Sequence, residues 1–180
     1  MQSKGNSMIL IILDLEDRLL EKRVMYTFNQ IMLYLGYPYE IRSKFDKNLL
    51  GNGKYSILIY YGNKNLNLKN KKCSIQIIPN KKQKKLYYSK DKRTVIFNHD
   101  FVLESFNILA REEEIGSKYI DAHKRFIASK SSISKYLEHP IINQNILILD
   151  KLIKKLYNAS KKPLLQKCQW PKNKRFAVCL

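Results

Sequence analysis

The chain has 180 residues, a hydrophobic content of 44% and a formal net charge of +19. This length and apolar content exclude a disordered chain and predict one domain with a sizeable core, alone or followed by a tail. A charge this high favours an anionic partner, but Lys, Asn, Ile and Tyr are all abundant, so we prefer AT-rich codon usage as its source.

The first half of the chain predicts alternating strands and helices. Residues 8–13 form an uninterrupted aliphatic run, as expected of a buried strand. An amphipathic helix should follow from about Asp17 to Leu35, where Gly36 and then Pro38 end it. Its inner face is predicted to consist of Val24, Phe28, Ile31 and Leu35. Further strands are predicted at residues 39–45, 55–61, 73–79 and 94–98.

A basic segment at residues 80–93 carries Tyr87 and Tyr88 among its lysines. Basic residues with interleaved aromatics can hold a single-stranded nucleic acid by charge and stacking. We prefer a solvated hairpin or loop with both tyrosines on the sheet, because lysines lack the bidentate phosphate contacts of arginine. A nucleic-acid-binding module using residues 81–93 stays the alternative function. Its anion-binding candidates are Lys81, Lys82, Lys84, Lys85 and Arg93.

A second helix is predicted to begin after Asn98 or Asp100, either of which can cap it. Its apolar residues recur with a helical period, and we expect the helix to run on into Arg111–Glu114. Residues 133–138 predict a short helix, and residues 142–158 predict a longer one with lysines near its C-terminal end. The predicted apolar face of the second helix is Phe101, Val102, Ser105, Phe106 and Leu109.

A polar cluster follows this second helix in sequence. We interpret it as a network of salt bridges that fixes the connection to the next helix, because an unpaired buried charge is very costly. Replacing Arg111 with Ala should then cost about one to a few kcal/mol if the pairs are buried. The predicted cluster consists of Arg111, Glu112, Glu113, Asp121, His123 and Arg125.

A metal site is the competing interpretation of this cluster. Glu113, Asp121 and His123 are chemically able to bind a metal, but neighbouring arginines compete for the carboxylates. A self-contained enzyme built on His123 is a third reading. The chain has no G-x-x-x-x-G-K, G-x-G-x-x-G or G-x-S-x-G motif. No nucleotide cradle is therefore encoded.

Three short motifs lie between Asp100 and Asn143 and carry a resemblance to a known family. They follow the patterns D-x-x-x-x-x-F-x-x-L-S-R-x-E-E, D-x-H-G-R-F and R-P-x-V-N, with Ala110, Lys124 and His139 as departures. The segment resembles an N-terminal domain, of unassigned function, that precedes the catalytic domain in polysaccharide deacetylase-like proteins. The matching residues are Asp100, Phe106, Leu109, Arg111, Glu113, Glu114, Asp121, His123, Arg125, Phe126, Pro140 and Asn143.

Lysine at position 124, where the family pattern has glycine, leaves two readings of the local turn. Either the turn does not need a positive φ, or the chain accepts some strain to form it.

The last eleven residues, WPKNKRFAVCL, carry a second resemblance. They are similar to the start of a NodB-type (carbohydrate esterase family 4-like) deacetylase domain, in which T-H-D-V-D follows and supplies the catalytic base and a metal ligand. The resemblance implies an accessory domain at 1–158, a linker at 159–174 and the first strand of an absent barrel at 175–180. It also implies that this chain is non-catalytic and has no cofactor of its own. A divalent metal is expected only in that absent domain, which would be the partner in cis, and a glycan is a possible ligand.

The expected fold is α/β or α+β, with one mixed sheet of about five strands packed by helices. Cys73, Cys168 and Cys179 lack C-x-x-C spacing, so we expect no zinc site or disulfide framework. The apolar run at 8–13 is too short for a signal peptide or a membrane span. We therefore expect a cytoplasmic protein.

Overall fold

A six-stranded sheet forms the centre of the computed structural model, which describes residues 7–46, 54–64, 66, 73–79, 87–134 and 139–160. The strand order is β2-β1-β3-β4-β6-β5. Among these described strands β5 runs antiparallel to its neighbour and the other pairings are parallel. The predicted mixed sheet is confirmed, with one strand more than expected because β5 forms within the basic segment. The strands are β1 Met8–Asp14, β2 Tyr39–Ser43, β3 Tyr55–Gly62, β4 Cys73–Ile77, β5 Tyr87–Ser89 and β6 Thr94–Phe97.

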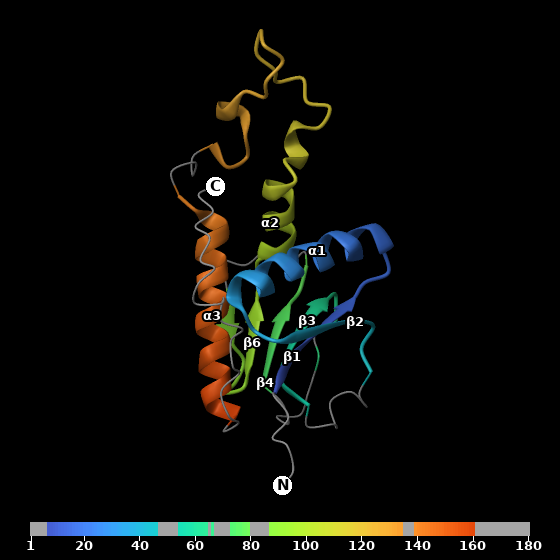
Figure 1. The fold of residues 1–180 in the computed structure, drawn as a ribbon, viewed down its shortest axis with the longest axis vertical. Helices are drawn as coiled ribbons and strands as arrows, with labels where there is room; N and C mark the ends of the chain where they lie inside the picture. Colours follow the sequence, from blue (N-terminus) through green and yellow to red (C-terminus); the bar gives the residue numbers. More distant parts are fainter. Residues whose placement is uncertain are drawn as a thin grey trace, which may run out of the picture.

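Within the described ranges, three α-helices pack on the same face of this sheet (Figure 1). They are α1 Arg18–Leu35, α2 Phe101–Leu109 and α3 Ile141–Ser160. All share one core with the inward side chains of the parallel strands, for example Ile11 and Ile59. The predicted inner face of α1 is confirmed, because Val24, Phe28 and Ile31 are buried there. None of the helices in the described ranges has the length and apolar character that crossing a bilayer requires.

The opposite face of the sheet is also buried. Leu10 and Tyr60 are fully buried there, beside the partly buried side chains of Phe45 and Leu66. Gln76 is fully buried as well, and its side-chain amide bonds both the backbone N–H and the backbone C=O of Leu66, at 3.0 and 2.9 Å. The connection between β3 and β4 therefore lies over this face at Leu66. Its backbone supplies the hydrogen-bond partners that the buried amide of Gln76 needs.

The helix ends follow from single residues. Asp17 caps α1 by accepting the Leu19 N–H at 2.7 Å, and Gly36 ends it with a left-handed φ of 73°. Asp100 caps α2 by accepting the Leu103 N–H at 3.0 Å. The predicted extension of α2 into residues 111–114 is wrong. Arg111 adopts a φ of 52°, which an α-helix cannot contain, and Glu112–Glu114 form a separate 3-10 turn.

Buried tyrosines tie two of the helices to the sheet layer. The Tyr61 hydroxyl, on β3, donates to Asp100 at the start of α2 at 2.6 Å. The Tyr37 hydroxyl, just before β2, donates to Asp150 on α3 at 2.6 Å. Burial and, second, the neighbouring Asp100 raise the pKa of Tyr61, so its hydroxyl stays a donor at all ordinary pH values.

We predict that Tyr61→Phe lowers the free energy of unfolding by about 1–3 kcal/mol, because it removes a donor from a partly buried carboxylate. Urea denaturation measures this change. The matched control is Tyr34→Phe, since Tyr34 is 63% exposed, and it should change stability by less than about 0.5 kcal/mol. Equal stability of the two variants would contradict the role given to Tyr61.

The carboxylate of Glu40 generates a prediction about acid stability. It accepts from Lys54 at 2.7 Å and from Tyr55 at 2.6 Å, and these bonds lower its pKa from 4.5 to about 2. A lowered pKa contributes stability that is present above the ordinary pKa and is lost as the pH falls through the folded value. Glu40→Gln should therefore lose stability at about pH 7 and show a weaker decline between about pH 4.5 and 2. Urea titrations at several pH values check this, and an unchanged pH profile would reject it.

Candidate functional site

Residues 110–134 leave the body of the domain as a projecting arm, shown at the top of Figure 1. No residue from 106 to 134 is buried. The predicted inward side chains of Phe106 and Leu109 are accordingly not part of the core, and Leu109 is 47% exposed. The arm therefore keeps its shape through its own turns and polar contacts rather than through a hydrophobic core.

Charged residues organise the base of the arm in separate pairs. Arg111 pairs with Glu114, with Nε and Oε1 2.6 Å apart. Glu113 accepts from the hydroxyl of Ser131 and from the backbone N–H of Ser132, which lowers its pKa and joins the outgoing and returning chain. Glu112 turns away from the arm and pairs with Arg23 on α1 at 3.2 Å.

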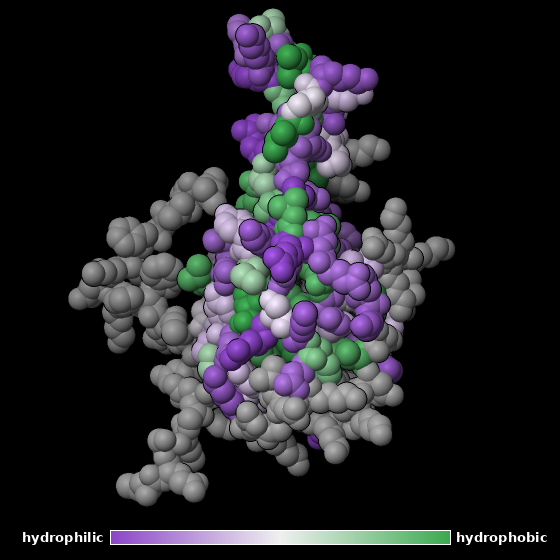
Figure 2. Space-filling view, turned by 90° about the vertical axis from the view of Figure 1, so that its right-hand side faces the viewer, coloured by the Kyte–Doolittle hydropathy of each residue, from purple (hydrophilic) through white to green (hydrophobic). Residues whose placement is uncertain are grey.

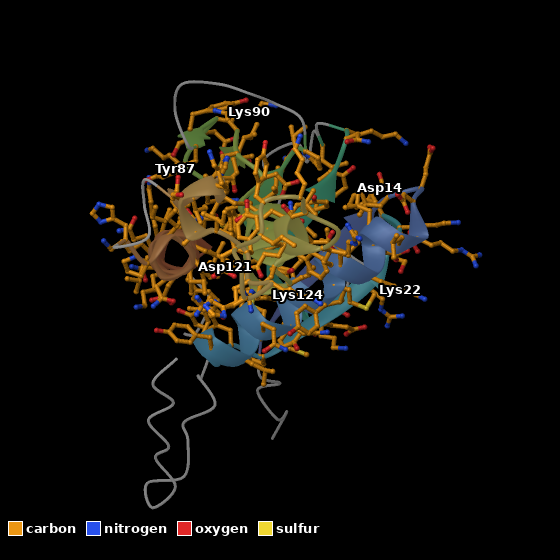
Figure 3. The ribbon with its side chains drawn as sticks, turned by 90° about the horizontal axis from the view of Figure 1, so that it is seen from above. Asp14, Lys22, Tyr87, Lys90, Asp121 and Lys124 are labelled. Carbon is orange, nitrogen blue, oxygen red and sulfur yellow. The ribbon has the colours of Figure 1, made fainter. Side chains whose placement is uncertain are left out.

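The tip of the arm is a tight reversal closed by an antiparallel bridge between Ile120 and Phe126. Asp121 accepts from the backbone N–H groups of Arg125 and His123, at 2.9 and 2.8 Å, and from the Arg125 guanidinium at 2.9 Å. The hydrogen bonds from Arg125 are the main reason why the pKa of Asp121 is lowered. Figure 3 looks down onto this tip, where Asp121 and Lys124 are labelled.

Lys124 adopts a φ of 61°, the left-handed conformation that favours glycine. Of the two readings of this position, the second is therefore the right one: the turn needs a positive φ and the chain accepts the strain. The cost is about 1 kcal/mol for a residue with a Cβ atom.

The six predicted cluster residues thus do not form one network. Arg111 and Glu113 act at the base, whereas Asp121 and Arg125 act at the tip, and His123 contributes only its backbone N–H to the bonds just described. In the described ranges, no three His, Cys, Asp or Glu side chains are grouped as a metal site requires. The geometry thus makes Glu113 and Asp121 turn-forming residues at opposite ends of the arm.

Apolar side chains are exposed along the arm, and Figure 2 shows them in green near its top. Ile115 is 74% exposed, Ile120 is 50% exposed and Tyr119 is 44% exposed. The ammonium groups of Lys118 and Lys130 lie 5.5 and 5.7 Å from the centre of the Tyr119 ring. The arm therefore combines exposed apolar side chains with lysines that lie over an aromatic ring, and exposed apolar surface is the feature that points to an interaction site.

The basic segment is only partly described. Lys81, Lys82, Lys84 and Lys85 lie outside the described residues, and so do the predicted turn at 50–53, residues 135–138, the linker from residue 161 and the terminal strand. Arg93 lies in the turn before β6, where its backbone N–H bonds Asp91 at 2.6 Å. The expected hairpin is confirmed for β5 and β6, and anion binding by this segment stays a prediction.

A second polar site, which was not predicted from the sequence, lies at the carboxyl ends of β1, β2 and β3. A pocket of about 670 Å³ opens there, and its lining includes Asp14, Lys44 and Lys64. Each of these residues ends or closely follows a buried or half-buried strand. Polar residues directly after parallel strands are the signal that points to such a site, because those strand ends share one edge of the sheet.

Comparisons with known proteins give one match. The sequence model described as "Family of unknown function (DUF7033)" matches residues 13–158, from the end of β1 to the last turn of α3. No curated protein and no solved structure matches the chain. The match covers both the arm and the pocket.

The exposed geometry of Arg111 changes the expected effect of its removal. Its side chain is 71% exposed, so its bond to Glu114 is an exposed ion pair rather than a buried one. We predict that Arg111→Ala changes the free energy of unfolding by less than about 1 kcal/mol. Thermal or urea unfolding measures this, and a loss of several kcal/mol would show that the arm is coupled to the core.

Proposed function

The chain belongs to this family of unknown function, and from that premise we propose that it is a non-catalytic accessory domain whose arm binds a polysaccharide deacetylase-like catalytic domain. The observation that carries the proposal is the arm itself. It buries none of its own residues and exposes Ile115, Tyr119 and Ile120. Exposed apolar surface on a projecting segment favours an interaction site, as exposed apolar patches do on soluble domains.

The shape of the arm suits it to binding. Asp121 fixes the tip through two backbone N–H groups, and Glu113 joins the outgoing and returning chain at the base. These contacts order the arm before any partner arrives, so less conformational entropy is lost on association. In the complex, Ile115 and Ile120 would act as the buried anchors, and Lys118 and Lys130 would lie at the rim.

The choice of partner rests on where the resemblance lies. The residues shared with the accessory domains of deacetylase-like proteins include Arg111, Glu113, Asp121 and Arg125, and these are the residues that shape the arm. We therefore expect the partner to be a NodB-type domain, a metal-dependent hydrolase that removes acetyl groups from amino sugars. The metal and the catalytic residues would belong to that domain, and this chain would orient or stabilise it on its glycan.

A binding titration with a purified NodB-type domain from the same genome tests the proposal. We expect saturable binding, and we expect the double variant Ile115→Ser/Ile120→Ser to weaken it about tenfold or more. Because these side chains are outside the core, the double variant should keep the melting temperature of the parent chain.

The matched control is Leu33→Ser/Leu147→Ser, which removes two apolar side chains, 60% and 52% exposed, from α1 and α3. This control should bind like the parent chain. Absence of binding by the parent chain, or equal losses in both double variants, would contradict the proposed function.

A further inference from the structure

The pocket at the carboxyl edge of the sheet has the place and size of a small-molecule site. It has a volume of about 670 Å³ and opens between the ends of β1, β2 and β3, and Figure 3 labels Asp14 at this edge. Its volume lies within the range of about 300–1,000 Å³ that ligand pockets occupy. The chain leaves β1 toward β2 on one side and leaves β3 toward β4 on the other. In open α/β sheets, ligands bind where connections diverge in this way.

Buried groups hold the floor of this pocket in place. The Tyr60 hydroxyl donates to Asp14 Oδ2 at 2.8 Å and accepts a bond from the backbone N–H of Lys64. Tyr60 is fully buried, and burial followed by Asp14 raises its pKa, so it remains a donor. A Cβ atom on Gly62 would lie 2.7 Å from that hydroxyl oxygen and 2.9 Å from the Asp14 carbonyl oxygen. Only glycine fits here, so the floor is a built feature of the fold.

The wall formed by the segment after β2 is also constrained. Lys44 adopts a φ of 72°, and its N–H bonds the Leu13 carbonyl at 3.0 Å. The hydroxyl of Ser43 donates to Glu21 on the first turns of α1. Phe45 packs edge-on against Tyr60, with ring centres 6.4 Å apart, and adds an apolar side to the pocket. Strained residues persist where the surrounding structure fixes them, and they cluster at binding sites.

The charges of the pocket are divided into two sets. Arg18, Lys44 and Lys64 come from three different chain segments, and none of them takes part in an ion pair within the described residues. The acidic set consists of Asp14, Glu16 and Glu21, and hydroxyl groups orient Asp14 and Glu21. An anion without hydroxyl groups would be repelled by these carboxylates. An uncharged sugar would leave the three cations without a charged partner.

We propose that this pocket binds a phosphorylated sugar or a closely similar hydroxylated phosphate. The phosphate would contact Arg18, Lys44 and Lys64, because charged donors give phosphate its strongest hydrogen bonds. The sugar hydroxyls would donate to Asp14 and Glu21 and lie beside the ring of Phe45. The net charge of +19 would attract such an anion to the protein from a distance.

Calorimetric titration with three probes tests this assignment. Glucose 6-phosphate carries both groups, whereas inorganic phosphate and glucose each carry one. We expect glucose 6-phosphate to bind at least about tenfold more tightly than either of the others. Equal binding of inorganic phosphate would overturn the proposal in favour of a plain anion site, and equal binding of glucose would show that the cations are not used.

Variants locate the binding. Lys44→Gln/Lys64→Gln should weaken binding of glucose 6-phosphate about tenfold or more. The control Lys151→Gln/Lys155→Gln removes the same charge from exposed positions of α3 and should bind like the parent chain. Asp14→Asn should keep phosphate binding and reduce the preference for glucose 6-phosphate over phosphate. Equal effects of the two lysine pairs, or an unchanged preference in Asp14→Asn, would overturn the assignment.

Discussion

The pairing of β1 with β3 at the centre of the sheet is the constraint on which the rest of the structure depends. All eight residues of β3 are buried, and residues 9–13 of β1 are buried as well. Strands that are covered on both faces cannot carry charged side chains along their length without an unfavourable loss of hydration. Charged groups near these two strands are therefore confined to strand ends and to segments that leave the sheet. The pocket lies at strand ends, and the arm is a segment that leaves the sheet.

Tyrosine hydroxyls allow this apolar centre to hold polar partners at its margins. Tyr60 and Tyr61 are neighbours on β3 and point to opposite faces, because side chains alternate along a strand. One reaches Asp14 beside the pocket and the other reaches Asp100 at the start of α2. The same strand thus orders the edge where a ligand would bind and anchors the helix from which the arm departs. The proposed sugar phosphate site and the helix that carries the arm are thus linked to opposite faces of the same end of this strand.

The sequence predicts most elements because their apolar residues recur with clear periods. Each described strand from β1 to β4, and helices α1 and α3, lies within a few residues of its predicted place. The end of α2 was not predictable, because no residue type in the segment 110–114 indicates that Arg111 adopts a positive φ. The polar residues of the arm stand out in the sequence, but their pairing does not. Glu113 finds its partners 18 and 19 residues away, at Ser131 and Ser132, which depends on how the arm turns back. The pocket was missed for a similar reason, because its residues meet only once the strand order is known.

The outer strand β2 has a consequence for how copies of this domain meet. An edge strand offers unpaired backbone N–H and C=O groups to other chains, and strand pairing between molecules leads to aggregation. Here β2 carries Glu40 and Arg42 on one side, linked to each other at 2.6 Å, with Lys54 bound to the same carboxylate. A second molecule adding a strand at this margin would have to strip water from these charges. These charged side chains therefore disfavour intermolecular strand pairing, and so fibril formation, at β2.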